Sequence, residues 1–215
     1  AGDQFRSDSM ILARIDPQSK QVTMVSLHRD TLIDMGTNGK QKLNAAHSIG
    51  GAAYTIEVVS KFAGVPISHY AEIDFDGFKE AVDALGGVEV DVPMEINDED
   101  AGGHLDAGLQ TLNGDQALIL CRARHAYDQY GAGDYYRTAN QRMVLGAILK
   151  KALSGNPFML LATLNAASAS VSTDITGIEL MILGARFVGF DMSKNLYSGL
   201  EPTKSEYVGG TWYEK

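Results

Sequence analysis

Hydrophobic and polar residues at the start of the chain are arranged in a way that predicts a β-hairpin. Ser9–Ile15 and Gln21–Leu27 are rich in the apolar residues that strands favour. Asp16–Lys20, which lies between them, contains the proline and polar residues that are typical of a turn. The two runs therefore predict a pair of antiparallel strands.

Helical patterns and short β-rich runs follow the hairpin. Helices are predicted at five places: Ala45–Phe62, Phe75–Leu85, the segment opened by the capping pattern Asn113-x-x-Gln116, Asp134–Leu153, and the segment from Thr176-x-x-Glu179 to about Phe190. The β-rich runs Tyr70–Ile73 and Val88–Val92 lie between them. This alternation predicts an α/β fold, a three-layer α-β-α sandwich around a mixed, largely central β-sheet.

Composition and charge narrow the classes of function. Hydrophobic residues make up 45% and charged residues 21% of the 215 residues, which allows a packed core in one domain or two small ones. The formal net charge of −9 argues against nucleic acid or an anionic membrane surface as the main partner. The single cysteine, Cys121, excludes an internal disulfide and a zinc site of the CxxC kind.

Neither a membrane span nor a leader segment is evident from the sequence. The longest apolar stretches, such as Phe158–Ala162, are far shorter than the ~20 residues that a membrane helix needs. No signal peptide opens the chain, and we interpret Ala1–Gln4 as a cut end.

The commonest catalytic motifs are absent. The sequence has no GxxxxGKS/T, GxGxxG, HExxH or GxSxG, which excludes the usual nucleotide-binding, zinc-protease and serine-hydrolase classes. His28-Arg29-Asp30 matches the start of a kinase catalytic loop, but Gly36 occupies the position of the required asparagine. We therefore reject the kinase hypothesis.

An arginine and a carboxylate lie next to each other just before the predicted hairpin and again just after it. Arg6-Ser7-Asp8 precedes the first strand and Arg29-Asp30 follows the second, so antiparallel pairing brings both to one end of the sheet. Arg122 and Arg124 follow an apolar run further along the chain. If that segment is extended, their side chains point to one face and form a paired guanidinium wall; if it is helical, they diverge.

The long helix carries a polar stripe that becomes apolar. Asp134, Arg137 and Gln141 are spaced i, i+3, i+7 and share one face. The same face continues with residues that normally pack in a core: Val144, Leu145 and Ile148. We therefore expect the polar residues to face inward, with Arg137 in the first turn, where the helix dipole favours an anion.

Five of the eight arginines fall in segments that can converge: Arg6, Arg29, Arg122, Arg124 and Arg137. An acidic protein that gathers arginines in one place is suited to a polyanion, and neighbouring carboxylates suggest Mg²⁺ between protein and phosphate. Simpler interpretations stay open for single residues. These are surface ion pairs for Arg122 and Arg124, a helix N-cap for Asp134, turn positions for Asp8 and Asp30, and a solvated charge for Lys42.

Seven segments carry these residues in a fixed order: Arg6–Met10, Val25–Thr31, Lys42–Ala46, Asp83–Val90, Leu112–Leu118, Arg122–His125 and Asp134–Arg142. In order and spacing they resemble the LytR-CpsA-Psr family over roughly Arg6–Lys151. A weaker similarity extends to the C-terminus. Seven ordered motifs are far more specific than any one of them.

The resemblance implies a membrane-anchored phosphotransferase, with residues 1–215 as a single catalytic domain on the outer face of the cytoplasmic membrane, in the cell-wall space. The donor would be a polyprenyl-diphosphate lipid carrying a glycopolymer, such as wall teichoic acid or capsule. The acceptor would be a muramoyl hydroxyl of peptidoglycan, and polyprenyl phosphate would leave. The N-terminal anchor is expected outside this chain.

The resemblance also assigns roles to residues. Asp8 matches the family's metal carboxylate, which would bind Mg²⁺. Ligands of the substrate diphosphate are expected at six positions: Arg29, Lys42, Arg122, Arg124, Arg137 and Gln141. Arg29 and Arg122 would also be catalytic, and either Asp134 or Asp30 would be the base for the acceptor hydroxyl.

Two features depart from the family pattern. His28 stands where the family usually has proline, and no Gly-x-Asp-x-Arg strand precedes the first matching segment. Because that strand carries a second metal carboxylate, we expect an incomplete metal site in this chain.

A lipid substrate requires an apolar slot. Ala45–Phe62 and Phe158–Ala162 are candidate walls, although core packing is the simpler explanation for each of their residues. Two alternative functions remain. A non-catalytic polyprenyl-phosphate lipid-binding protein would need neither base nor metal, and a lipid diphosphate hydrolase (pyrophosphatase) would use water as the nucleophile.

Overall fold

The computed structural model describes residues 7, 9–131, 133–154, 165 and 170–215. The chain divides into two compact units. The first consists of Ala1–Ala13, Met24–Tyr70 and Ser198–Lys215, and the second of Arg14–Thr23 and Ala71–Tyr197. Each unit has a hydrophobic core of its own.

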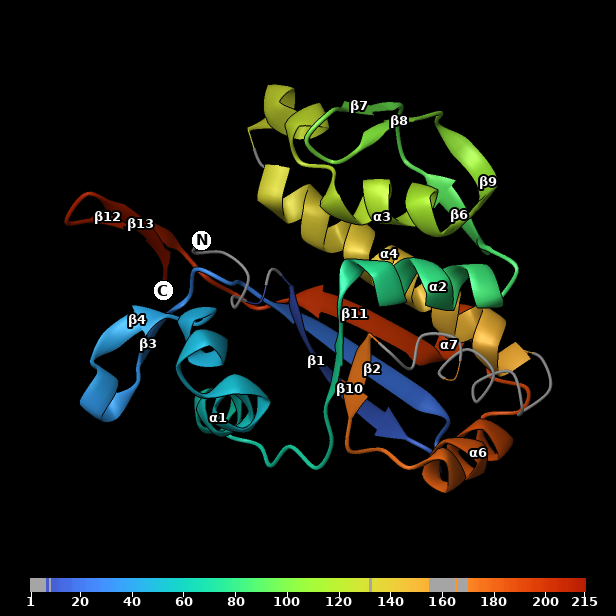
Figure 1. Cartoon of the computed structure of the whole chain (residues 1–215), viewed down its shortest axis with the longest axis horizontal. Coiled ribbons are helices and arrows are strands. Elements are labelled where there is room, and N and C mark those ends of the chain that lie inside the picture. The colour runs from blue at the N-terminus through green and yellow to red at the C-terminus, as the bar shows by residue number, and fades with distance from the viewer. Residues whose placement is uncertain (1–6, 8, 132, 155–164, 166–169) are drawn as a thin grey trace. The chain divides into compact units, whose positions relative to one another are not determined.

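The predicted hairpin is present. Strands β1 (Met10–Asp16) and β2 (Gln21–Leu27) form it, and β11 (Leu196–Leu200) extends it to a sheet with the order β1-β2-β11 (Figure 1). The Asp16 carboxylate closes the turn, because its Oδ1 accepts hydrogen bonds from the backbone N–H groups two and three residues later, at 3.0 and 3.2 Å.

The first unit is built around helix α1 (Ala45–Ala63). Its other elements are β3 (Leu32–Asp34), η1 (Gly36–Asn38), β4 (Lys40–Lys42), β12 (Ser205–Val208) and β13 (Thr211–Glu214). β3 pairs with β4, and β12 with β13, both antiparallel. Buried residues of its core are Leu27, Ile33, Met35, Leu43, Ala46, Val58 and Val59.

Helix α1 confirms the helix predicted at Ala45–Phe62 but is broken at two glycines. Gly51 has a φ of 63°, which glycine adopts at no steric cost. A Cβ added to Gly50 would lie 2.6 Å from the Tyr54 Cβ, so this position also needs a residue without a side chain. Gly64, in the left-handed conformation, caps the C-terminus of the helix.

The second unit contains most of the helices. These are α2 (Phe75–Ala84), α3 (Gly114–Arg122), η2 (His125–Tyr130), α4 (Gly133–Ser154), α6 (Gly177–Arg186) and α7 (Met192–Asn195). Its strands form antiparallel pairs: β5 (Ala71–Ile73) with β10 (Val171–Thr173), β6 (Val88–Val92) with β9 (Gly108–Leu112), and β7 (Ile96–Asp98) with β8 (Gly103–Leu105). The predicted α/β class is confirmed.

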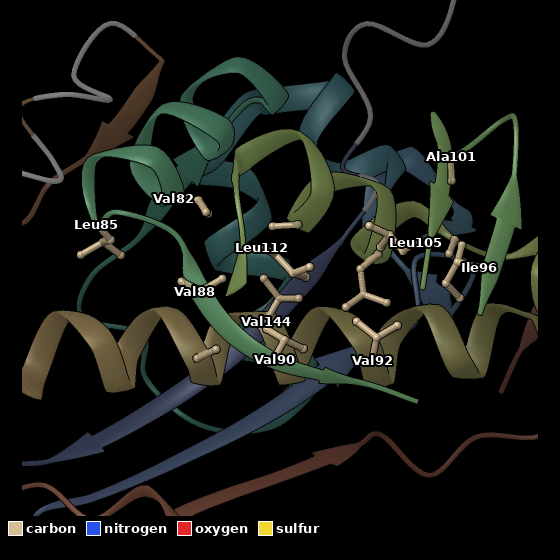
Figure 2. Packing of buried hydrophobic residues seen from close by; sticks show 14 of the residues in the cluster. Val82, Leu85, Val88, Val90, Val92, Ile96, Ala101, Leu105, Leu112 and Val144 are labelled. Atoms are coloured by element: carbon tan, nitrogen blue, oxygen red, sulfur yellow. The ribbon is translucent and has the colours of Figure 1, made fainter. Parts of the chain in front are cut away.

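The core of the second unit is formed where α2, α3 and α4 pack around β6 and β9. Val88, Val90 and Val92 alternate along β6 and are buried, whereas the residues between them are exposed. Figure 2 shows these valines beside Leu112 of β9 and Val144 of α4. Alternation along one strand therefore places a full row of apolar side chains against α4.

The predicted helix caps are also confirmed. The Asn113 N–H donates to Gln116 Oε1 at 3.0 Å, and the Gln116 N–H donates back to Asn113 Oδ1 at 2.9 Å, which opens α3. Thr176 and Glu179 form the same reciprocal pair at the start of α6. In the described part of the chain, no helix combines the length and hydropathy needed to cross a membrane.

Candidate functional site

A charged turn follows β2 in the first unit. The Lys42 Nζ lies 2.7 Å from Asp30 Oδ1, and the Arg29 Nε lies 3.7 Å from Asp30 Oδ2. All three side chains are roughly one-third exposed. The Lys42 ammonium also lies 5.6 Å from the centre of the Tyr213 ring, within reach of a cation–π contact. Lys42 is thus held by two partners, so the interpretation as a solvated charge is wrong.

Backbone hydrogen bonds fix this turn. The Asn44 N–H donates to the Arg29 carbonyl at 3.0 Å, and the Leu43 N–H donates to the Thr31 carbonyl at 2.8 Å. The Glu214 N–H, from β13, donates to the Asp30 carbonyl at 3.1 Å. Two segments distant in sequence therefore set the backbone that carries Arg29 and Asp30.

Glu201 is a buried carboxylate behind the same turn, with only 6% of its surface exposed. Its Oε1 accepts hydrogen bonds from the His28 N–H at 3.0 Å and from the Thr31 hydroxyl. Its own N–H donates to the Ser26 carbonyl at 3.0 Å. Glu201 could not be predicted from the sequence, because a single glutamate after a short strand belongs to no motif.

The segment that carries Arg122 and Arg124 is neither a strand nor a continuous helix. Arg122 is the last residue of α3, and Ala123 leaves the helix with φ −55° and ψ 119° before η2 begins. The paired guanidinium wall therefore stays a prediction. Ala117–Cys121 is apolar because it buries one face of a helix, and an apolar run this short fits a helix as well as a strand.

The Arg122 guanidinium makes two contacts within the second unit. Its Nη2 donates to the Asp100 carbonyl at 2.8 Å, and its Cζ lies 5.2 Å from the centre of the Phe75 ring. Phe75 is half-exposed, so the pair lies at the surface of the second unit.

Asp98, at the end of β7, holds the turn between the two arginines. Its Oδ2 accepts hydrogen bonds from the N–H groups of Arg124 and His125, both at 2.8 Å, and its Oδ1 accepts from the Ala101 N–H at 3.0 Å. Burial favours the neutral acid, but the backbone N–H groups of Arg124 and its neighbours outweigh this and lower the pKa of Asp98. Asp98 could not be predicted from the sequence, because it is one of several carboxylates in an acidic stretch.

The polar stripe of α4 is only partly turned inward: Arg137 and Gln141 are largely covered, whereas the Asp134 side chain is 39% exposed. The Arg137 side chain is 11% exposed, and its Nη2 lies 2.6 Å from Asp134 Oδ1. α4 begins at Gly133, so Asp134 is a first-turn residue and the N-cap interpretation is wrong. The Gln141 Nε2 donates to the Cys121 carbonyl at 3.1 Å, near the C-terminus of α3.

The residue that accepts this hydrogen bond, Cys121, has a free thiol. Burial raises its pKa to about 12. The sulfur therefore remains a neutral thiol at physiological pH, which is the state expected of a structural cysteine.

The predicted site residues thus form two sets. Arg29, Asp30 and Lys42 belong to the first unit, and the second unit contains the other described ones: Arg122, Arg124, Asp134, Arg137 and Gln141. Convergence of both sets on one diphosphate stays a prediction. Arg6, Asp8 and the candidate lipid wall Phe158–Ala162 lie outside the described residues. Among the described residues, no group of three or more His, Cys, Asp or Glu side chains is suited to a metal ion.

Two clefts in the second unit have mainly polar linings. One, of about 470 Å³, lies between β7 and η2. The other, of about 460 Å³, lies beside α2 and the start of α3. Neither is an apolar tunnel, so the isoprenoid slot stays a prediction that the described residues do not test.

Comparison with known proteins gives a consistent result. The polyisoprenyl-teichoic acid–peptidoglycan teichoic acid transferase TagV of Bacillus subtilis is 35% identical over 202 residues, covering 90% of this chain and 51% of that protein. The corresponding TagU of Enterococcus faecalis is 39% identical over 176 residues, covering 81% and 56%. The chain thus spans about half the length of these relatives.

Structural comparison agrees. The crystal structure of B. subtilis TagV superposes with a TM-score of 0.86 at 33% identity, covering all of this chain and 85% of that one. The sequence model of the LytR_cpsA_psr family matches residues 1–214, which includes both compact units. The chain therefore belongs to the LytR_cpsA_psr family.

Proposed function

We propose that this chain is the catalytic domain of a phosphotransferase that moves a polyprenyl-diphosphate-linked glycopolymer, of the teichoic acid kind, onto peptidoglycan. The names of the two relatives support this donor and this acceptor. The observation that carries most weight within the chain is Arg137, a guanidinium that is 11% exposed and set against Asp134. A cation held in this way is suited to a phosphate group.

In phosphoryl transfer the protein contributes mainly by positioning the reactants and neutralising charge, and little by covalent chemistry of its own. The acceptor hydroxyl oxygen attacks the phosphorus that bears the glycopolymer, and a new P–O bond forms. The bond from that phosphorus to the bridging oxygen breaks, and polyprenyl phosphate leaves with the electron pair. Arg122 and Arg137, both in the second unit, are the arginines we propose to stabilise the charge that grows on the leaving group.

The proton of the acceptor hydroxyl passes to a carboxylate. Asp30 and Asp134 are the two candidates. Each lies against a cation, Lys42 Nζ at 2.7 Å from Asp30 Oδ1 and Arg137 Nη2 at 2.6 Å from Asp134 Oδ1.

The proposal includes a Mg²⁺ ion and an anchor. Asp8, by its resemblance to the family's metal carboxylate, is the expected ligand, and the ion would neutralise diphosphate charge. Asp30 is a poor second ligand, because Lys42 and Arg29 already lie against its oxygens. We also propose that the protein acts outside the cytoplasmic membrane, held there by an N-terminal anchor.

The test is a transfer assay with the full-length protein, a lipid-linked donor and peptidoglycan. Arg137→Ala is expected to lower kcat/KM for adduct formation by about 100-fold or more, because it removes a charge that the transition state needs. Arg186→Ala is the matched control, since Arg186 is an exposed arginine in the last turn of α6. It should behave like the unaltered protein.

The same assay separates the competing functions by product. A glycopolymer–peptidoglycan adduct supports transfer. Release of phosphate products without an adduct would mean a lipid diphosphate hydrolase, and donor binding without turnover would mean a carrier. Either of the last two results overturns the proposed transferase.

A further inference from the structure

The cleft between β7 and η2 has walls of two kinds. Planar polar groups line most of it and two small apolar surfaces lie among them, the lining residues being Met94, Glu95, Asn97, His125, Ala126 and Gln129. It is an open cleft of about 470 Å³. Carboxamide and carboxylate groups offer both donors and acceptors, and the apolar surfaces offer contact for C–H groups. This combination suits a sugar or an acetamido group.

The polar lining is held in place by its own hydrogen bonds. The Asn97 Nδ2 donates to Glu95 Oε1 at 3.0 Å, and its Oδ1 lies 2.8 Å from His104 Nδ1. On the opposite wall, His125 Nδ1 lies 3.1 Å from Asp128 Oδ2. Side chains that are already fixed lose little conformational entropy when a ligand binds.

The charge around the cleft is negative. No lysine or arginine lines the described cleft, whereas Glu95 lines it and Asp100 and Asp128 flank His125. A polyanion such as a diphosphate lipid or a teichoic acid chain would be repelled here. The cleft therefore favours an uncharged or cationic ligand. The anionic donor is expected to bind at the arginines instead.

The cleft is joined rigidly to the arginine turn. Asp98 Oδ2 accepts from the N–H groups of both Arg124 and His125 at 2.8 Å. The Asp98 carboxylate thus fixes the backbone of two adjacent residues: Arg124, a predicted diphosphate ligand, and His125, which lines the cleft. A ligand in the cleft would lie next to the Arg124 backbone, within the same unit.

From these observations we infer that the β7–η2 cleft binds the acceptor through the N-acetylated sugar units of a peptidoglycan strand, which carry no charge themselves, beside the turn that carries Arg122 and Arg124. This inference rests on the proposed transferase function. It adds a binding site for the acceptor whose residues, apart from His125, lie outside the seven family-like segments.

The experiment uses the full-length protein and soluble, uncrosslinked peptidoglycan strands. The double substitution Asn97→Ala/Gln129→Ala is expected to weaken strand binding about tenfold or more, because two hydrogen-bonding groups are lost. Binding of the polyprenyl-diphosphate donor should not change. Glu99→Ala is the control, since Glu99 is an exposed acidic residue of the same hairpin that does not line the cleft. In NMR spectra, strands should shift the amide signals of residues 94–97 and 125–129.

Each outcome separates the inference from the proposed function. If the unaltered protein makes the adduct but the double substitution leaves strand affinity and acceptor KM unchanged, the cleft inference fails and the transferase stands. If strands bind at the cleft and no adduct ever forms, the transferase fails and the binding site stands. Amide shifts confined to other surfaces would also overturn the inference.

Discussion

Asp98 and Glu201 are both buried carboxylates behind an arginine-bearing turn, but they use their oxygens differently. Asp98 accepts backbone hydrogen bonds at both oxygens. Glu201 accepts two hydrogen bonds at Oε1, and its buried Oε2 has no hydrogen-bond partner among the described residues. We therefore expect the two carboxylates to respond differently when each is replaced by the corresponding amide.

Asp98→Asn is expected to lower the free energy of unfolding by about 2–4 kcal/mol. An asparagine has only one acceptor oxygen, so its NH₂ group must face backbone N–H donors. Glu201→Gln should cost less than about 1 kcal/mol, because the amide oxygen keeps the contacts of Oε1. Urea unfolding of both variants measures the difference. Equal losses would contradict these assigned roles.

Asp98 also predicts an acid-dependent part of stability. Its folded-state pKa lies below the usual 3.8, because the hydrogen bonds outweigh the effect of burial. A carboxylate whose pKa is lowered by folding stabilises the folded state at pH values above its pKa in the unfolded chain. This stability is lost as the pH falls through its pKa in the folded state. The stability gap between the unaltered protein and Asp98→Asn should therefore narrow from neutral pH to below about pH 4. A gap that is constant with pH would exclude this coupling.

At the scale of elements, local patterns predicted where α3 and α6 begin but not where α3 ends. The caps at Asn113 and Thr176 follow from side chains three residues apart, which the sequence displays directly. The end of α3 depends on contacts from α4, where the Asn140 and Gln141 side chains donate to carbonyls of Leu120 and Cys121. Such contacts join residues about twenty positions apart and leave no local pattern.

Gln141→Ala tests this account of α3. Loss of the hydrogen bond to the Cys121 carbonyl is expected to lower the free energy of unfolding by about 1 kcal/mol. Gln110→Ala is the control, because the Gln110 side chain also donates to a backbone carbonyl but in an exposed contact. Thermal or urea unfolding compares the two. A control variant that loses as much stability would mean that the position on α4 has no special role.

For the whole molecule, the sequence predicted the family and its arginines but not the supports behind them. Arg29, Arg122 and Arg137 stand in ordered motifs, whereas Asp98 and Glu201 act through backbone amides of other segments. Their function depends on tertiary contacts, and carboxylates are frequent in a chain of net charge −9. Motifs identify the groups that face a substrate more readily than those that hold them.

The two cores differ in size, and hydrogen exchange should detect this. Among the described residues, the core of the second unit joins sixteen buried residues, and that of the first joins seven. Backbone amides of β6 are therefore expected to exchange more slowly than those of β3. Local opening costs more free energy where more apolar contacts must break. Mass spectrometry of exchanged peptides measures both. Faster exchange in β6 would show that core size does not set the order of opening.

The nearly unreactive sulfur of α3 makes the protein convenient for labelling. With a pKa of about 12 for Cys121, only about one thiol in 100,000 is a thiolate at neutral pH. Maleimide dyes should therefore pass over the native cysteine and react with cysteines introduced at exposed positions. One dye in each compact unit would then report the distance between the two arginine sets by fluorescence energy transfer, with and without a lipid donor.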